Sequence, residues 1–115
     1  MGTTAIRRFF RLKVELATAP GRPRGCLVTN SELASRDRGT GTRVGAVLAK
    51  IEAAFERAVV RAQAAGEIDP KRNARALARF LTSSAQGLSV MAKASPDHTT
   101  LDDIVRVILE VVARR

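Results

Sequence analysis

Side chains that commonly do chemistry are scarce in this 115-residue chain. The single histidine, His98, follows Asp97 in a polar stretch, and the single cysteine, Cys26, lies far from both in the sequence. A tetrahedral metal site needs three or four ligands, so these residues cannot form one alone. No Gly-x-Ser-x-Gly motif supplies a serine nucleophile. We therefore expect no catalytic residue, no metal ion and no cofactor, and the chain is not expected to be an enzyme.

Two patterns resemble phosphate-binding elements without meeting their requirements. In "GTGTRVG", Val44 stands where the dinucleotide-binding fingerprint needs a glycine, and no strand precedes the segment. We interpret this segment as a flexible turn before a helix. Arg72, Arg75 and Arg79 form a stripe at helical spacing that could touch phosphates. A solvated helix face is the commoner explanation of such a stripe.

Charge and composition narrow the class of protein. The net charge is +9, and the first 43 residues hold nine basic and three acidic side chains. Such a balance favours acidic partners, nucleic acid among them. Aromatic residues make up only 3% of the chain, so base stacking on single strands is not expected. With no apolar stretch near 18 residues and no uninterrupted signal-peptide core, we expect one cytoplasmic domain over residues 1–115 and no membrane partner.

The apolar spacing is helical throughout, which predicts an all-α fold of five helices. Proline and glycine clusters separate the helices. Gly66 is expected to end the third helix, Asp69 and Pro70 to begin the fourth, and Thr99 or Thr100 to cap the fifth. The predicted ranges are 3–18, 25–35, 42–65, 70–94 and 100–113.

The apolar faces of the third and fifth helices differ in width. Apolar residues of the third helix fall within about 120°, which suits one side of a core: Val44, Val47, Leu48, Ile51, Phe55, Ala58 and Val59. Those of the last helix spread over about 200° and need cover on two sides. We expect a second copy of the chain to supply that cover, through residues 70–94 and 100–113. The alternative is that two helices of the same subunit enclose the last helix.

Three segments follow one another along the chain: "PRGCLVTNSELASRD", the junction "RAQAAGEID", and "ALARFLTSSAQGLSVMAKA", followed by a final apolar helix. Their order resembles the C-terminal domain of TetR family transcriptional regulators. The resemblance runs from about Phe9 to Val112 and implies a helical domain that binds small molecules in a core cavity. It also implies that the last two helices of each subunit form a four-helix bundle in a homodimer.

That resemblance also sets expectations about DNA. The family's helix-turn-helix precedes this domain, and only a few residues precede the first predicted helix here. We expect DNA binding only through that missing domain, absent by truncation, a misplaced start or the choice of fragment. The alternative is a small basic helical protein that binds another protein or nucleic acid through its arginine-rich first third.

Six residues are candidates for a pocket that takes a small hydrophobic ligand. Phe55, Phe80, Ser84 and Leu88 lie on predicted inward faces, and Leu27 and Asn30 belong to the short second helix. A mostly apolar pocket with a few polar groups is typical of ligand sites. Asn30 can instead bond to nearby backbone, and Ser84 can bond to its own helix in a filled core.

The candidates for the dimer interface come from the last two helices. The small-residue stretch around Gly87 would allow close approach of another helix. The expected interface residues are Gly87, Met91, Leu101, Ile104, Val105, Ile108 and Val112.

Overall fold

The computed structural model describes residues 2–18, 38–94 and 97–113. Its elements are α1 (Gly2–Thr18), α3 (Arg38–Ala64), α4 (Ala74–Ala94) and α5 (His98–Ala113), and no strand occurs within these ranges. The all-α prediction is therefore confirmed for this part of the chain. The predicted second helix at 25–35, with Cys26, Leu27 and Asn30, lies outside the described residues.

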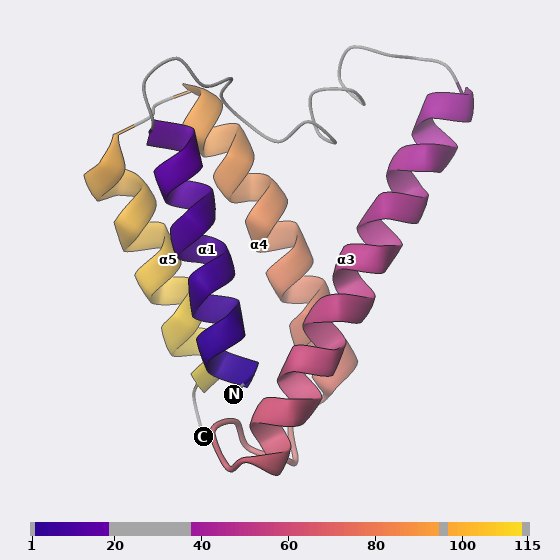
Figure 1. The fold of residues 1–115 in the computed structure, drawn as a ribbon, viewed down its shortest axis with the longest axis vertical. Coiled ribbons are helices and arrows are strands. Elements are labelled where there is room, and N and C mark those ends of the chain that lie inside the picture. Colours follow the sequence, from indigo (N-terminus) through magenta and orange to yellow (C-terminus); the bar gives the residue numbers. More distant parts are fainter. Residues whose placement is uncertain (1, 19–37, 95–96, 114–115) are drawn as a thin grey trace.

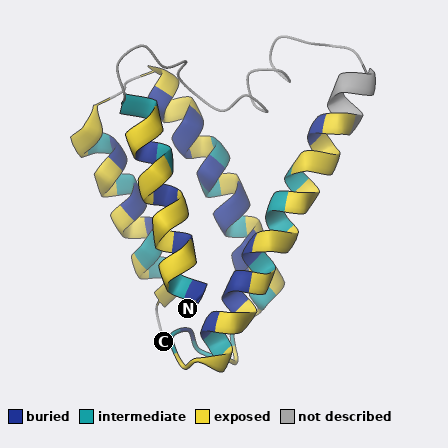
Figure 2. Cartoon of the chain, in the orientation of Figure 1, coloured by how far each residue is buried: buried dark blue, intermediate teal, exposed yellow. Residues whose placement is uncertain are grey.

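Helices α1, α4 and α5 form one group, and α3 leans against it at one end (Figure 1). The end of α3 near Ala64 lies close to the start of α1, whereas the end near Arg38 diverges from α1 and α4. This divergence explains why Val47, expected on the core face, is exposed. Most of the described side chains in the outer half of α3 are likewise exposed (Figure 2).

One continuous core joins all four helices. Phe10 of α1 stacks on Phe55 of α3, with ring centroids 6.0 Å apart, and each α5 turn contributes one buried aliphatic. The largest buried side chains include Phe10, Ile6, Ile68, Leu81, Leu101, Val59 and Val112. In this way the apolar stripes that the sequence places on separate helices meet in a single cluster.

The start of α3 differs from its prediction. The helix begins at Arg38, so Gly39 and Gly41 lie in its first turn and not in a break before it. The amides of a first helical turn have no partner within the helix, so glycine interrupts little there.

The α3–α4 turn confirms one predicted residue and corrects two. Gly66 has φ +79°, and its amide donates to the Gln63 carbonyl, as in a glycine helix end. Asp69 and Pro70 do not begin α4. The Asp69 carboxylate accepts from the Lys71 amide within the turn. The cap of α4 is Asn73, whose Oδ1 accepts from the Ala76 amide at 2.9 Å.

The cap of α5 also differs from the prediction. Asp97 replaces Thr99 and Thr100 in that role, because its carboxylate accepts from the Thr99 amide and from the Thr100 hydroxyl. Those two bonds, the Thr100 hydroxyl first, lower the pKa of Asp97, and desolvation opposes them.

Candidate binding groove and association face

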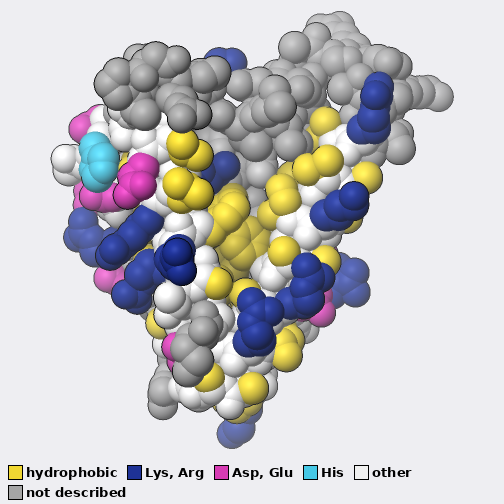
Figure 3. All heavy atoms as spheres, in the orientation of Figure 1, with side chains coloured by type: hydrophobic (Ala, Val, Ile, Leu, Met, Phe, Trp, Pro, Cys, Tyr) yellow, Lys and Arg dark blue, Asp and Glu magenta, His cyan; other side chains and the backbone are white. Residues whose placement is uncertain are grey.

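An apolar groove lies between α1 and α3. It has a volume of about 280 Å³, and its lining contains one charged residue, Arg61. The other lining residues are Ala5, Ile6 and Phe9 from α1 and Ile51, Ala54, Phe55 and Ala58 from α3. Hydrophobic side chains gather in the hollow between these helices (Figure 3). Such a lining suits an apolar ligand.

Two contacts set the width of this groove. At one end, Gly2 packs so closely on α3 that an added Cβ would lie 2.0 Å from the Ala58 carbonyl oxygen. Farther along, the rings of Phe9 and Phe55 meet edge to face at 5.2 Å. The two helices therefore touch near the α1 start and stand apart beyond it.

The predicted pocket residues do not all meet in this groove. Phe55 lines it, whereas Leu88 is buried in the subunit core. Phe80 and Ser84 are half-buried on α4. Leu27 and Asn30 fall outside the described ranges, so the six-residue site stays a prediction.

Ion pairs show which side of α4 faces α3. Nε of Arg75 and Nε of Arg79 lie 3.8 and 3.6 Å from the Glu52 carboxylate of α3. Ser84 follows Arg75 by nine residues, which at about 100° per residue places it on the opposite side of α4. Phe80 and Ser84 therefore lie away from α3.

The arginine stripe of the sequence has a structural role. Arg72 Nη1 donates to the carbonyls of Val111 at 2.7 Å and Val112 at 2.9 Å, at the end of α5. These carbonyls lack partners within their helix, so the guanidinium caps it. Arg75 and Arg79 of α4 pair with Glu52 of α3, and Arg72, just before α4, bonds to the end of α5. The stripe therefore links neighbouring helices and is not simply a solvated face.

An uncharged surface covers the outer sides of α4 and α5, and we call it the association face. On α5, Val105 lines a groove shared with α1, and Val107 is turned about 200° from it. Because α5 contacts only α1 and α4 among the described helices, Val107 lies on the α4 side, outside the core. The face consists of Phe80, Ser83, Ser84, Gly87, Val90 and Met91 on α4 and Ile104, Val107 and Val111 on α5.

The predicted interface residues divide between the core and this face. Leu101, Val105, Ile108 and Val112 are buried within the subunit, so α1 and α4 already cover most of the wide apolar arc of α5. Gly87 and Met91 are exposed and Ile104 is half-buried on the association face. Val107, at 57% exposure, and Val90, at 47%, were not among the predicted residues. Val107 belongs to the wide apolar arc of α5 from which the dimer interface was predicted, and Val90 extends the association face along α4.

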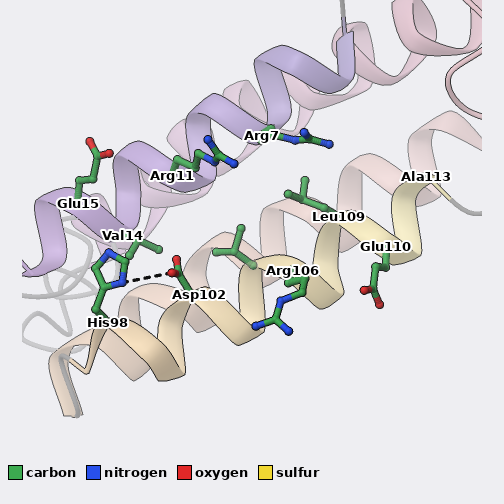
Figure 4. Close-up of a pocket in the computed structure, with 11 residues that line it drawn as sticks. Arg7, Arg11, Val14, Glu15, His98, Asp102, Arg106, Leu109, Glu110 and Ala113 are labelled. Carbon is green, nitrogen blue, oxygen red and sulfur yellow. Dashed lines mark ion pairs between the residues drawn. The ribbon is translucent and has the colours of Figure 1, made fainter.

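A second groove, of about 610 Å³, lies between α1 and α5 and is charged (Figure 4). Its basic residues are Arg7, Arg11 and Arg106, and its acidic residues are Glu15, Asp102 and Glu110. His98 also lines it, with Nδ1 3.2 Å from the Asp102 carboxylate, and Arg106 pairs with Asp103. Positive and negative side chains balance, so the groove does not favour a polyanion.

The described residues offer neither a metal site nor a membrane-spanning helix. Among the described residues, no group of three His, Cys, Asp or Glu side chains could hold a metal ion. None of the described helices is both long and apolar enough to cross a lipid bilayer.

Comparison with known proteins gives one match. The model of a family described as tetracyclin repressor-like, C-terminal domain, matches residues 2–108. Searches of curated proteins and of solved structures gave no significant match.

Proposed function

Because the chain belongs to the TetR-like C-terminal domain family of transcriptional regulators, we propose that it binds a small apolar effector and forms a homodimer. The association face carries the second half of this proposal. It presents exposed valine and methionine side chains on two adjacent helices with no charged residue among them. Contiguous apolar surface of this kind commonly marks an interface.

The effector half of the proposal is supported by the α1–α3 groove. Its lining is apolar apart from Arg61, and it opens beside the diverging half of α3. Effector binding there would bridge two helices that otherwise touch mainly at one end. A ligand that bridges them would stabilise one spacing of α1 and α3.

Three substitutions to aspartate test the dimer. Val107→Asp should give a folded monomer, because a charge would have to be buried in the subunit contact. Ile108→Asp, one residue later at 5% exposure, should unfold the subunit itself. Val60→Asp, at a valine 50% exposed on α3, should leave a folded dimer. Light scattering gives the mass and circular dichroism the fold. A dimeric Val107→Asp protein would exclude this face.

The alternative, nucleic-acid or protein binding through the basic first third, has one observation in its favour. Arg7, Arg8 and Arg11 are all exposed on α1. It predicts sequence-blind DNA binding at low salt that falls steeply as salt rises. The carboxylates beside Arg7 and Arg11 in the α1–α5 groove weaken this alternative.

A further inference from the structure

The α1–α3 groove has an asymmetric charge. Seven of its eight lining residues are apolar, and the eighth is Arg61, so no carboxylate offsets that positive charge inside the groove. In the part of the chain that the structure describes, the Arg61 guanidinium has no hydrogen bond or ion pair. Arg61 also borders a second, shallow hollow on the outer side of α3, where Glu56 lies without pairing to it.

Further positive charge lies along the same edge of α3. Lys50, Arg57 and Arg61 follow one another at spacings of seven and four residues. These spacings keep all three within about 40° on the helix. The acidic Glu52 of α3 faces α4, where Arg75 and Arg79 hold it. The potential at the rim of the groove is therefore positive, and basic side chains border the hydrophobic hollow on α3 (Figure 3).

The helices lie close together near Arg61, where Gly2 packs against the backbone of Ala58 and Ala62. Ala54 and Ala58 line the groove from α3, and Ala5 lines it from α1. Small side chains on both walls leave a slot between the helices, with Phe9 and Phe55 along it. A slender apolar chain fits such a slot better than a bulky ring system.

We infer that the effector is an amphiphilic monoanion, with an apolar chain between α1 and α3 and a carboxylate paired with Arg61. This inference rests on the proposed effector function and adds the chemical class of the ligand. A guanidinium binds a carboxylate through two parallel hydrogen bonds, which fixes the orientation of the bound chain. Arg61 is the one charged residue in the lining of the groove, which suits a ligand with one negative charge.

Calorimetry with two probes of equal chain length tests the inference. Decanoate, used below its micelle concentration, should bind the full chain about tenfold more tightly than decanol, a ratio in the range of one charge-assisted pair. Arg61→Gln should remove this preference and leave decanol binding unchanged. Arg57→Gln, one turn earlier on the same edge but outside the groove lining, should keep most of the preference.

A groove-filling variant tests the effector groove separately from the anionic class of the effector. Ala54→Phe should abolish binding of both probes while circular dichroism stays helical. Equal binding of decanoate and decanol by the wild type would overturn the anionic class and leave the apolar effector site intact. Binding of neither probe, or binding that Ala54→Phe does not affect, would overturn the effector groove as well.

Discussion

Gly2 determines how closely α1 can approach α3. A Cβ at this position would lie 2.0 Å from the Ala58 carbonyl oxygen and 2.8 Å from the Ala62 amide nitrogen, both of them backbone atoms. Gly2→Ala should therefore destabilise the domain by about 1–3 kcal/mol, since the backbone must shift to accept the methyl group. Urea unfolding measures the change, with the exposed Thr4→Ala as control. An unchanged unfolding midpoint would mean that α1 does not pack at this distance.

Asp97 links the stability of α5 to pH. Its pKa is lowered in the folded state by the Thr100 hydroxyl and the Thr99 amide. A lowered folded-state pKa means that the stabilisation is present above the unfolded-state pKa and is lost as pH falls through the folded-state value. Asp97→Asn should thus lower the melting temperature at neutral pH, and the difference from wild type should shrink in the acid range. A difference that stays constant with pH would contradict this role.

Single capping residues were the least predictable from the sequence. Asp69 and Asn73 are both good caps four residues apart, and so are Asp97 and Thr100 within one turn. At the α3–α4 turn, Gln63 Nε2 donates to the carbonyls of Asp69 and Arg72, which holds the turn and delays α4 until Ala74. Local sequence does not contain that contact.

At the scale of the helix, the association face makes a prediction about two glycines. An added Cβ meets nothing within 4 Å at Gly87 of α4 or at Gly45 of α3. Within one subunit, each change to alanine should stabilise its helix by up to about 1 kcal/mol. If a partner helix packs on the association face, only Gly87→Ala should also weaken association.

The comparison of the two alanine variants needs both a stability and a dissociation constant. Thermal unfolding gives the first, and dilution in sedimentation experiments gives the second. Gly45→Ala should leave dissociation unchanged. If both variants dissociate as the wild type does, Gly87 lies outside the subunit contact.

Helices and their buried stripes were predictable because they follow from local periodicity. The first helix, expected at 3–18, is Gly2–Thr18, and the last, expected at 100–113, is His98–Ala113. The neighbours of each stripe were not predictable in the same way. On a helical wheel, Phe80, Ser84 and Leu88 share one side of α4. The wheel does not show which helix lies against that side, whereas the pairing of Arg75 with Glu52 shows on which side of α4 helix α3 lies.

The groove was missed for a related reason. Ala5 and Phe9 lie on a stripe of α1 separate from the buried Ile6, Phe10 and Val14, and the sequence contains that stripe. That stripe lines a groove only because α3 diverges from α1, and this divergence is a property of the folded molecule (Figure 1). The wide apolar arc of α5, in contrast, was visible in the sequence, although the subunit itself buries most of it.

For the whole molecule, we propose that two chains associate through the outer sides of α4 and α5. Sedimentation equilibrium of the wild-type protein at micromolar concentration, at moderate salt, tests it most directly. We expect a species of twice the 12.4 kDa chain mass, which dissociates on Val107→Asp while remaining helical. A wild-type chain that sediments as a monomer throughout that concentration range would contradict it.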